Sequence, residues 1–336
     1  MSAPTATVHA MTVTDWLLDS DPAIRWQVMR DLLDAPPGQV EAERARVATE
    51  GWGAALLALQ DEDGTWDGGV YRPGWAREDR PFFDAWTGAH FTLHALATLG
   101  ADPSAPPVAR ALARVREHVR WWPDGPRFFD GETEPCVNGL ALVTTALLGE
   151  DAASLLARLL DDQLGDGGWN CEAEEGSTVS SFHSTICVLE GLLAAEQAGQ
   201  GTEQSIEARH RGEEYLLERA LLRRRRDGTI IDPRFSMLSY PGYWYYDVLR
   251  ALDHLRLGRP AGDDRCTEAI ALLRSKVDAD GRWHQELRHE GPTLLRLDVR
   301  EGEPSRWHTL RALRVLRWWD ARDTGGASPS EAGGPA

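Results

Sequence analysis

A recurring turn motif constrains the fold of this chain more than any other feature. Asp-Gly pairs begin at positions 63, 124, 166, 227 and 280, and three of them lead into a Trp, at Trp66, Trp169 and Trp283. Two of the turns also carry a Gln at the same offset, in "QDEDGTW" (60–66) and "QLGDGGW" (163–169). Recurrence of one turn motif is typical of a fold built from repeated copies of a single supersecondary unit.

Helix-periodic segments flank these turns on both sides. Before a turn the chain reads, for example, "ASLLARLLDDQL" (153–164), and after the following loop it reads "SSFHSTICVLEGLLAA" (180–195). Apolar residues at i, i+3, i+4 and i+7 indicate helices in both series, and no alternating strand pattern of useful length is visible. The segments that follow the loops are more apolar and richer in small residues than the segments that precede the turns. Together with "TVTDWLLDS" (12–20) and "DPAIRWQVMRDLL" (21–33), the segments predict about six helix pairs.

The number of pairs favours a closed ring. A linear stack of helix pairs leaves two exposed ends that need polar caps, whereas a ring has no ends. We therefore predict an all-α protein with an α/α-toroid fold, a barrel of about six inner and six outer helices, in which the second helix of each pair faces the centre. One domain should span residues 1–321, and the Gly/Pro/Ser-rich tail 322–336 should be disordered.

Composition excludes several classes of partner. A net charge of −17 argues against a nucleic-acid-binding surface, which needs basic stripes. No run approaches the roughly 20 apolar residues of a membrane span. The N-terminus lacks a basic region followed by an apolar core, so we expect no secretory signal and a cytoplasmic location. The four cysteines, at 136, 171, 187 and 266, would then be thiols or metal ligands. An acidic surface with scattered apolar residues does not demand a partner subunit, and the sequence leaves the oligomeric state open.

The turn segments also resemble known families. "QDEDGTW" and "QLGDGGW" match the QxxxGxW motif of terpenoid cyclases of the squalene–hopene type, and "DGGWNC…SFHST" resembles the DGGFxC repeat of protein prenyltransferase β subunits. "DPAIRWQVMRDLL", "DPRF", "YYDVLRAL" and "PSRWHTLRALRVLRWW" resemble more closely uncharacterised bacterial proteins labelled squalene-cyclase-like. The resemblance runs from about Gln60 to Trp319. It implies a toroid and an apolar small-molecule substrate of the prenyl or polyprenyl type.

Two catalytic motifs of those families are missing. Squalene-type cyclases use a DxDD run as proton donor, and neither "DEDG" (61–64) nor "DARD" (320–323) matches it. The DDxxD motif of metal-dependent prenyl ionisation is also absent, since "DDQLGD" (161–166) belongs to a turn. The resemblance therefore implies the fold more firmly than the reaction.

The starts of the inner helices should converge on one rim of the ring. Polar and ionisable groups gathered above an apolar barrel are what a ligand site requires. From these starts and the preceding loops we predict substrate-binding roles for Trp86, His90, Phe182, Arg234, Tyr245, Arg306 and Trp307, and catalytic roles for Cys136, Cys171, His183, Asp247 and His308.

Cys136, Cys171 and His183 are the candidate metal ligands. Neighbouring inner helices lie about 8–10 Å apart, so residues at their ends can share a ligand sphere. Two thiolates and an imidazole with one open position form a plausible catalytic zinc site. The fourth ligand would be water, His90 or Asp247. The resemblance implies a similar Asp/Cys/His zinc site on neighbouring inner helices. A metal-free thiol or acid–base role, and a purely structural role in a turn and helix cap, stay open.

The other candidates have alternative structural roles. Asp247 would be an acid or cation stabiliser, or else a helix cap. Arg306 and His308 would hold an anionic head group. The aromatic candidates would line a pocket: Trp86, Phe182, Tyr245 and Trp307. Aromatic residues at helical spacing, however, are more often part of the core. His90 and His94, at i and i+4, share one helix face.

These observations predict a terpenoid cyclase/prenyltransferase-like protein that binds an extended apolar substrate, with zinc- or thiol-assisted chemistry at the rim. A non-enzymatic lipid- or peptide-binding toroid is the main alternative. A glycan-acting hydrolase is a further one, but it needs two facing carboxylates and only Asp247 is evident among the helix starts.

Overall fold

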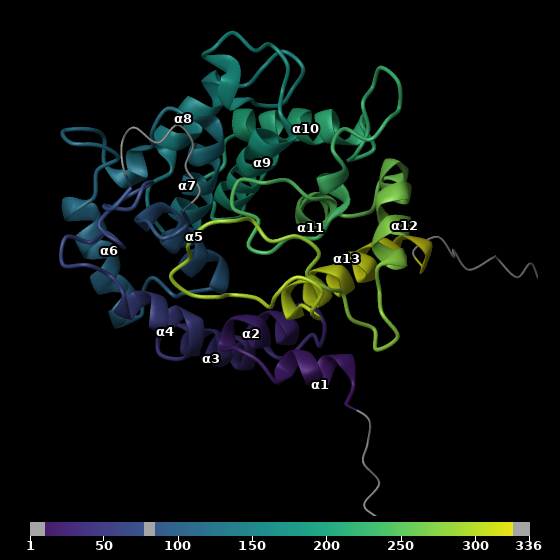
Figure 1. The fold of residues 1–336 in the computed structure, drawn as a ribbon, viewed down its shortest axis with the longest axis horizontal. Helices are drawn as coiled ribbons and strands as arrows, with labels where there is room; N and C mark the ends of the chain where they lie inside the picture. Colours follow the sequence, from purple (N-terminus) through teal and green to yellow (C-terminus); the bar gives the residue numbers. More distant parts are fainter. Residues whose placement is uncertain (1–10, 77–84, 325–336) are drawn as a thin grey trace, which may run out of the picture.

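The computed structural model describes residues 11–76 and 85–324, and within them no β-strand is present. The inner helices form a ring around the centre, and the remaining helices lie outside it (Figure 1). The inner helices are α2 (Pro22–Asp31), α5 (Ala89–Leu99), α7 (Pro135–Leu147), α9 (Phe182–Gln197), α11 (Val248–Gly258) and α13 (Arg306–Thr324). The outer helices are α1 (Val13–Leu18), α3 (Pro37–Ala45), α4 (Gly51–Ala58), α6 (Pro106–His118), α8 (Ala153–Asp161), α10 (Glu203–Leu217) and α12 (Thr267–Ser275). The prediction of an all-α toroid is confirmed.

Small residues set the spacing of the most deeply buried inner helices. In α7 every residue from Pro135 to Ala146 is buried. A Cβ atom added at Gly139 would lie 2.5 Å from the backbone of Cys187 on α9, and one at Gly191 would lie 2.6 Å from the Gly139 carbonyl oxygen. The two helices therefore pack backbone against backbone, which explains why the inner series is richer in small residues.

The repeated motif anchors its Trp-bearing turns to the outer helices. The indole Nε1 of Trp169 donates to the Leu159 carbonyl oxygen in the last turn of α8, at 2.7 Å. Trp66 and Trp283 make the same bond, each to a carbonyl ten residues earlier in its outer helix. The Gln163 amide donates to the carbonyl oxygens of Gly167 at 2.7 Å and Ala208 at 2.8 Å, and so joins the turn to α10. Gln60 joins its turn to α6 in the same way.

The ring closes where α13 packs against α2, so that the yellow helix lies beside the purple one (Figure 1). Arg314 on α13 donates to Gln27 Oε1 at 3.0 Å and Asp31 Oδ2 at 3.2 Å on α2. The same guanidinium donates to Asp253 Oδ1 on α11 at 2.8 Å. One side chain thus links three inner helices at the closure.

Helix α13 continues to Thr324, so the predicted start of the tail at 322 falls inside this helix. The rest of that tail, 325–336, lies outside the described residues. Among the helices of the described ranges, none is both long and apolar enough to cross a bilayer.

Two loops cover the N-terminal ends of the inner helices. One spans residues 239–247 and the other 284–305. Trp86 joins them, since its ring stacks on Tyr243 with centroids 4.0 Å apart and its indole donates to the Glu290 carbonyl oxygen at 2.7 Å. In the second loop Asp298 Oδ2 accepts from Ser305 Oγ at 2.6 Å. Burial raises the pKa of Asp298 to about 7, against the lowering effect of that hydrogen bond.

Replacing Trp169 by Phe tests the anchoring role of the turn motif. The variant loses the indole donor and leaves the Leu159 carbonyl unpaired at a buried position, so the free energy of unfolding should fall by about 1–3 kcal/mol. Trp122→Phe is the control, because Trp122 is 46% exposed and a surface change of this kind costs within about 0.5 kcal/mol. Chemical denaturation measures both variants, and equal losses would contradict the proposed anchor.

Asp298→Asn should change how stability depends on pH. The folded-state pKa of Asp298 lies above that of the unfolded chain, so its contribution to stability is present below about pH 4. That contribution is lost as the pH rises through about 7, because the unfolded carboxyl ionises first. The variant should therefore gain stability relative to wild type between pH 4.5 and pH 8 in urea titrations. A difference that stays constant over this range would show that Asp298 is not buried as described.

Candidate functional site

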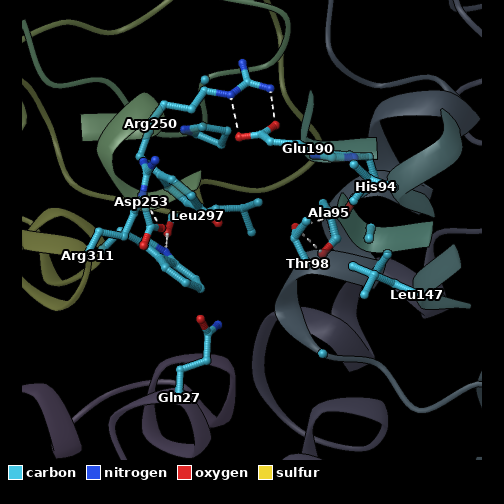
Figure 2. Close-up of a pocket in the computed structure, with 18 of the residues that line it drawn as sticks. Gln27, His94, Ala95, Thr98, Leu147, Glu190, Arg250, Asp253, Leu297 and Arg311 are labelled. Atoms are coloured by element: carbon cyan, nitrogen blue, oxygen red, sulfur yellow. Dashed lines mark hydrogen bonds and ion pairs between the residues drawn. The ribbon is translucent and has the colours of Figure 1, made fainter. Parts of the chain in front are cut away.

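A cavity of about 400 Å³ lies at the centre of the ring (Figure 2). All of its solvent-exposed lining residues lie in the last turns of inner helices: Arg30, Leu147, Gln197 and Leu257. The cavity therefore opens at the C-terminal ends of the inner helices. At the opposite end Trp86, Tyr240 and Tyr243 close it. The N-terminal ends of the inner helices, where we expected an open site, are therefore closed, because the two loops fold over them.

The walls of the cavity differ in character. Toward α5 and α7 the lining includes Ala95, Thr98 and Leu147, and toward α11 and α13 it includes Arg250, Asp253 and Arg311 (Figure 2). Further apolar surface comes from the following lining residues: Leu56, Phe91, Val143, Leu193, Ala194, Leu294, Leu295, Leu297 and Trp307. A mostly apolar wall facing a charged one suits a molecule with an apolar body and a polar end.

Glu190 and Arg250 form the first charged group of the lining, with dashed lines joining them in Figure 2. Arg250 Nε lies 2.8 Å from Glu190 Oε1, and Nη2 lies 2.5 Å from Oε2. Arg250 Nη1 also donates to the carbonyl oxygens of Tyr243 and Tyr245. Burial alone would raise the pKa of Glu190, but the neighbouring guanidinium outweighs it and lowers that pKa. The pair is therefore ionised at neutral pH.

Asp253 is the centre of the second charged group. It accepts hydrogen bonds from Arg256 at 3.0 Å, Arg314 at 2.8 Å and Arg311 at 3.3 Å. Burial opposes its ionisation, yet these guanidinium groups hold the pKa of Asp253 far below its usual value. Among the described residues Arg311 makes this one hydrogen bond through Nε, which leaves its two terminal nitrogens available to a ligand.

The lining carries more positive than negative groups. The positively charged lining residues are Arg30, Arg44, Arg250, Arg311 and Arg314, and the negatively charged ones are Glu190 and Asp253. Asp31, which pairs with Arg30 and Arg314, reduces the excess without removing it. Arg30 and Arg44 both lie over the Trp26 ring, at 4.6 and 5.5 Å from its centroid. An excess of guanidinium groups inside a chain of net charge −17 points to an anionic ligand group.

His94 is a neutral polar residue on the α5 side of the cavity. Burial lowers the pKa of His94 to about 4, so the imidazole is uncharged at neutral pH. Its Nδ1 is buried and has no hydrogen-bond partner among the described residues. A neutral imidazole of this kind can accept a proton or a hydrogen bond from a ligand.

The predicted metal ligands are brought together in part. Cys136 Sγ and Cys171 Sγ lie 2.6 Å apart, and Glu134 Oε2 lies 3.7 Å from Cys136 Sγ. His183 is not in this group, because its Nδ1 accepts the Tyr246 amide at 2.8 Å and its ring packs against Phe235. The Glu134, Cys136 and Cys171 ligand atoms all lie within 4.8 Å of one another.

The spacing of the two sulfur atoms bears on whether zinc fits. Two thiolates on one tetrahedral zinc lie about 3.8 Å apart, since each Zn–S bond is about 2.3 Å. Cys136 and Cys171 would have to separate by roughly 1.2 Å to reach that spacing. The remaining ligands would be Glu134 and water. Neither His90 nor Asp247 belongs to the group that shares a ligand sphere. Zinc at this pair stays a prediction.

Most of the other predicted site residues lie away from the cavity. Trp86 and Trp307 line it. Asp247 caps α11, with Oδ1 accepting the Arg250 amide at 2.9 Å, and burial raises its pKa. His308 is buried, with Nε2 2.5 Å from Gln285 Oε1. The others occupy the aromatic core, the covered end or the outer surface: His90, Phe182, Arg234, Tyr245 and Arg306.

Two of these residues contact partners outside the cavity, and their predicted substrate-binding roles stay predictions. Arg306 Nε donates to the Trp16 carbonyl oxygen at 3.1 Å, and its guanidinium lies over the Trp16 ring. Arg234 is exposed and pairs with Asp232. The charged residues that do line the cavity were missed because they lie within inner helices and not at their starts. Single charges in apolar segments, such as Glu190 in "STICVLEGLLAA", were the available signal.

Comparisons with known proteins add a distant likeness. No protein-family model matches this sequence, and no curated protein matches it. Among solved structures the chain is similar to ent-copalyl diphosphate synthase from Streptomyces platensis, with a TM-score of 0.40 and 18% sequence identity over 97% of this chain. The chain spans 61% of the length of that protein. The toroid assignment rests on the helix arrangement described above and not on this likeness.

Proposed function

We propose that this protein binds an extended apolar molecule with an anionic head group, of the prenyl diphosphate type, in its central cavity. The observation that carries the proposal is the excess of guanidinium groups in the lining of a mostly apolar cavity. Arginine pairs with phosphate and carboxylate oxygens through several N–H groups at once. Arg311, whose terminal nitrogens are available, would hold the head group, and the α5 and α7 wall would hold the apolar chain.

The size and lining of the cavity support a ligand of this class. Its volume of about 400 Å³ lies within the usual range of small-molecule sites. Each buried methylene of a ligand contributes about 0.8 kcal/mol, so a prenyl chain would supply much of the affinity. The opening at the C-terminal ends of the inner helices, beside Arg30 and Leu147, would admit the chain from solvent.

The lining suits binding and proton acceptance better than proton donation. Both lining carboxylates, Glu190 and Asp253, are held ionised by arginines, so neither can start a cyclisation by protonating an alkene. His94 could accept a proton, and the faces of Trp86 and Trp307 could stabilise a cation. This balance favours the non-enzymatic binding alternative over a protonation-initiated cyclase.

A glycan hydrolase is less well supported by the same two carboxylates. That reaction needs one carboxyl group that stays protonated near neutral pH and a second one that is ionised. Glu190 and Asp253 both have lowered pKa values because of their arginine partners. The cavity therefore lacks a lining acid for this chemistry within the described residues.

Calorimetry with farnesyl diphosphate, farnesol and inorganic diphosphate tests the proposal. Farnesyl diphosphate should bind more tightly than farnesol, since only the former engages the guanidinium groups. Arg311→Gln should weaken farnesyl diphosphate binding by about tenfold, the loss of one charge-assisted contact, and should barely affect farnesol. Arg274→Gln is the matched control, because Arg274 is exposed on α12 and pairs with Asp320.

Two results would count against the proposal. Equal affinity for farnesol and farnesyl diphosphate would remove the head-group site. Equal losses in the Arg311 and Arg274 variants would show that binding occurs on the outer surface and not in the cavity.

A further inference from the structure

We propose that Cys136 and Cys171 form a reversible disulfide that fastens the start of α7 to the loop before α9. Cys136 is buried in the first turn of α7, and Cys171 is half-buried at the start of the 3₁₀-helix Cys171–Ala173. Their sulfur atoms lie 2.6 Å apart although the residues are 35 positions apart in the sequence. Both are free thiols in the structure.

The fold holds both thiols in place. The Cys171 amide donates to Ser184 Oγ at 3.2 Å, and Ser184 Oγ donates to Cys171 Sγ at 3.3 Å. Two residues earlier Trp169 is fully buried, with its amide donating to Thr185 Oγ1 at 3.0 Å. Helix α9 therefore positions the loop, and the deeply buried helix α7 positions Cys136. The packing of α7 against α9 therefore holds the two sulfur atoms close together.

The spacing favours a bond between the sulfurs over a metal ion between them. A disulfide is about 2.05 Å long, so the atoms need approach by only about 0.6 Å. A shared zinc requires them to move apart by about twice that distance. The other two cysteines, Cys187 and Cys266, are fully buried, and Cys187 Sγ donates to the Trp244 carbonyl oxygen at 3.5 Å.

Thiol–disulfide exchange with a small external disulfide, of the oxidised glutathione class, would form the bond. The more accessible Cys171 thiolate attacks one sulfur of that disulfide, forms a mixed disulfide and releases one small thiolate. Cys136 then loses its proton to solvent and attacks Cys171 Sγ, which releases the second small thiolate. The protein loses two electrons and two protons, and the external disulfide becomes two thiols. A reducing dithiol reverses both steps.

The pair lies at the covered end of the ring, and neither cysteine lines the cavity. Oxidation should therefore stabilise the fold and leave the open end unchanged. Closing a chain segment of this length restricts the unfolded state and should raise the Tm by roughly 5 °C. The proposal does not depend on the identity of the cavity ligand.

The test is a redox titration of the full chain in mixtures of reduced and oxidised glutathione. Samples are quenched in acid, denatured and alkylated, and the free thiols are counted by intact mass. Two of the four cysteines should become protected in one transition, and a digest should contain the peptide that joins Cys136 to Cys171. Dithiothreitol should restore both thiols. Cys171→Ser and Cys136→Ser should each abolish the transition, whereas Cys266→Ser should keep it.

Circular dichroism of each variant, together with the wild-type Tm in oxidised and reduced buffer, separates loss of the bond from loss of the fold. The proposal is overturned if both thiols remain alkylatable in oxidised glutathione. It is also overturned if each cysteine forms only its own glutathione adduct. Elemental analysis that finds one zinc per chain, lost in both variants and protecting the thiols from oxidation, would instead assign a metal site.

Discussion

The contact between α13 and α2 is the constraint on which the rest of the structure depends. Without it the helix pairs would form an open solenoid with two apolar ends. Arg314 takes part in this contact by pairing with Asp31 of α2, and its 10% exposed side chain also pairs with Asp253 of α11. Burial opposes its charge, but the two carboxylates outweigh burial and raise the pKa of Arg314. Because Arg314 also lines the cavity, ring closure and cavity formation share one side chain.

Charges inside the ring require an explanation beyond stability. Replacing a buried ion pair with well-packed apolar residues is often neutral or stabilising, so such pairs are weak evidence of a structural role. Here the charges do not balance, since three arginines surround Asp253 and two more arginines lie over Trp26. An anionic ligand would neutralise the remaining excess. This unbalanced positive charge is the feature on which the proposed anion site depends.

How much of this could be predicted from sequence depends on which property is considered. The repeated turn with its Trp predicts the toroid because the indole bond and the helix periodicity are local. The meeting of Cys136 and Cys171 also follows from the order of the inner helices. The position of His183, the third predicted ligand, does not follow from that order, because adjacent residues on a helix point about 100° apart. On α9 it is Ser184 that contacts Cys171, and its neighbour His183 instead faces Phe235 and Tyr246.

The position of the cavity mouth could not be predicted, because the loops that cover the other end carry no periodic signal. A crystal structure of the protein with farnesyl diphosphate would show whether the ring encloses a site for an amphipathic anion. We expect density for the apolar chain between α5, α7 and α13, with head-group oxygens within hydrogen-bond distance of Arg311. Density confined to the outer surface, or a cavity occupied in the opposite orientation with the head group beside Trp86, would contradict this expectation.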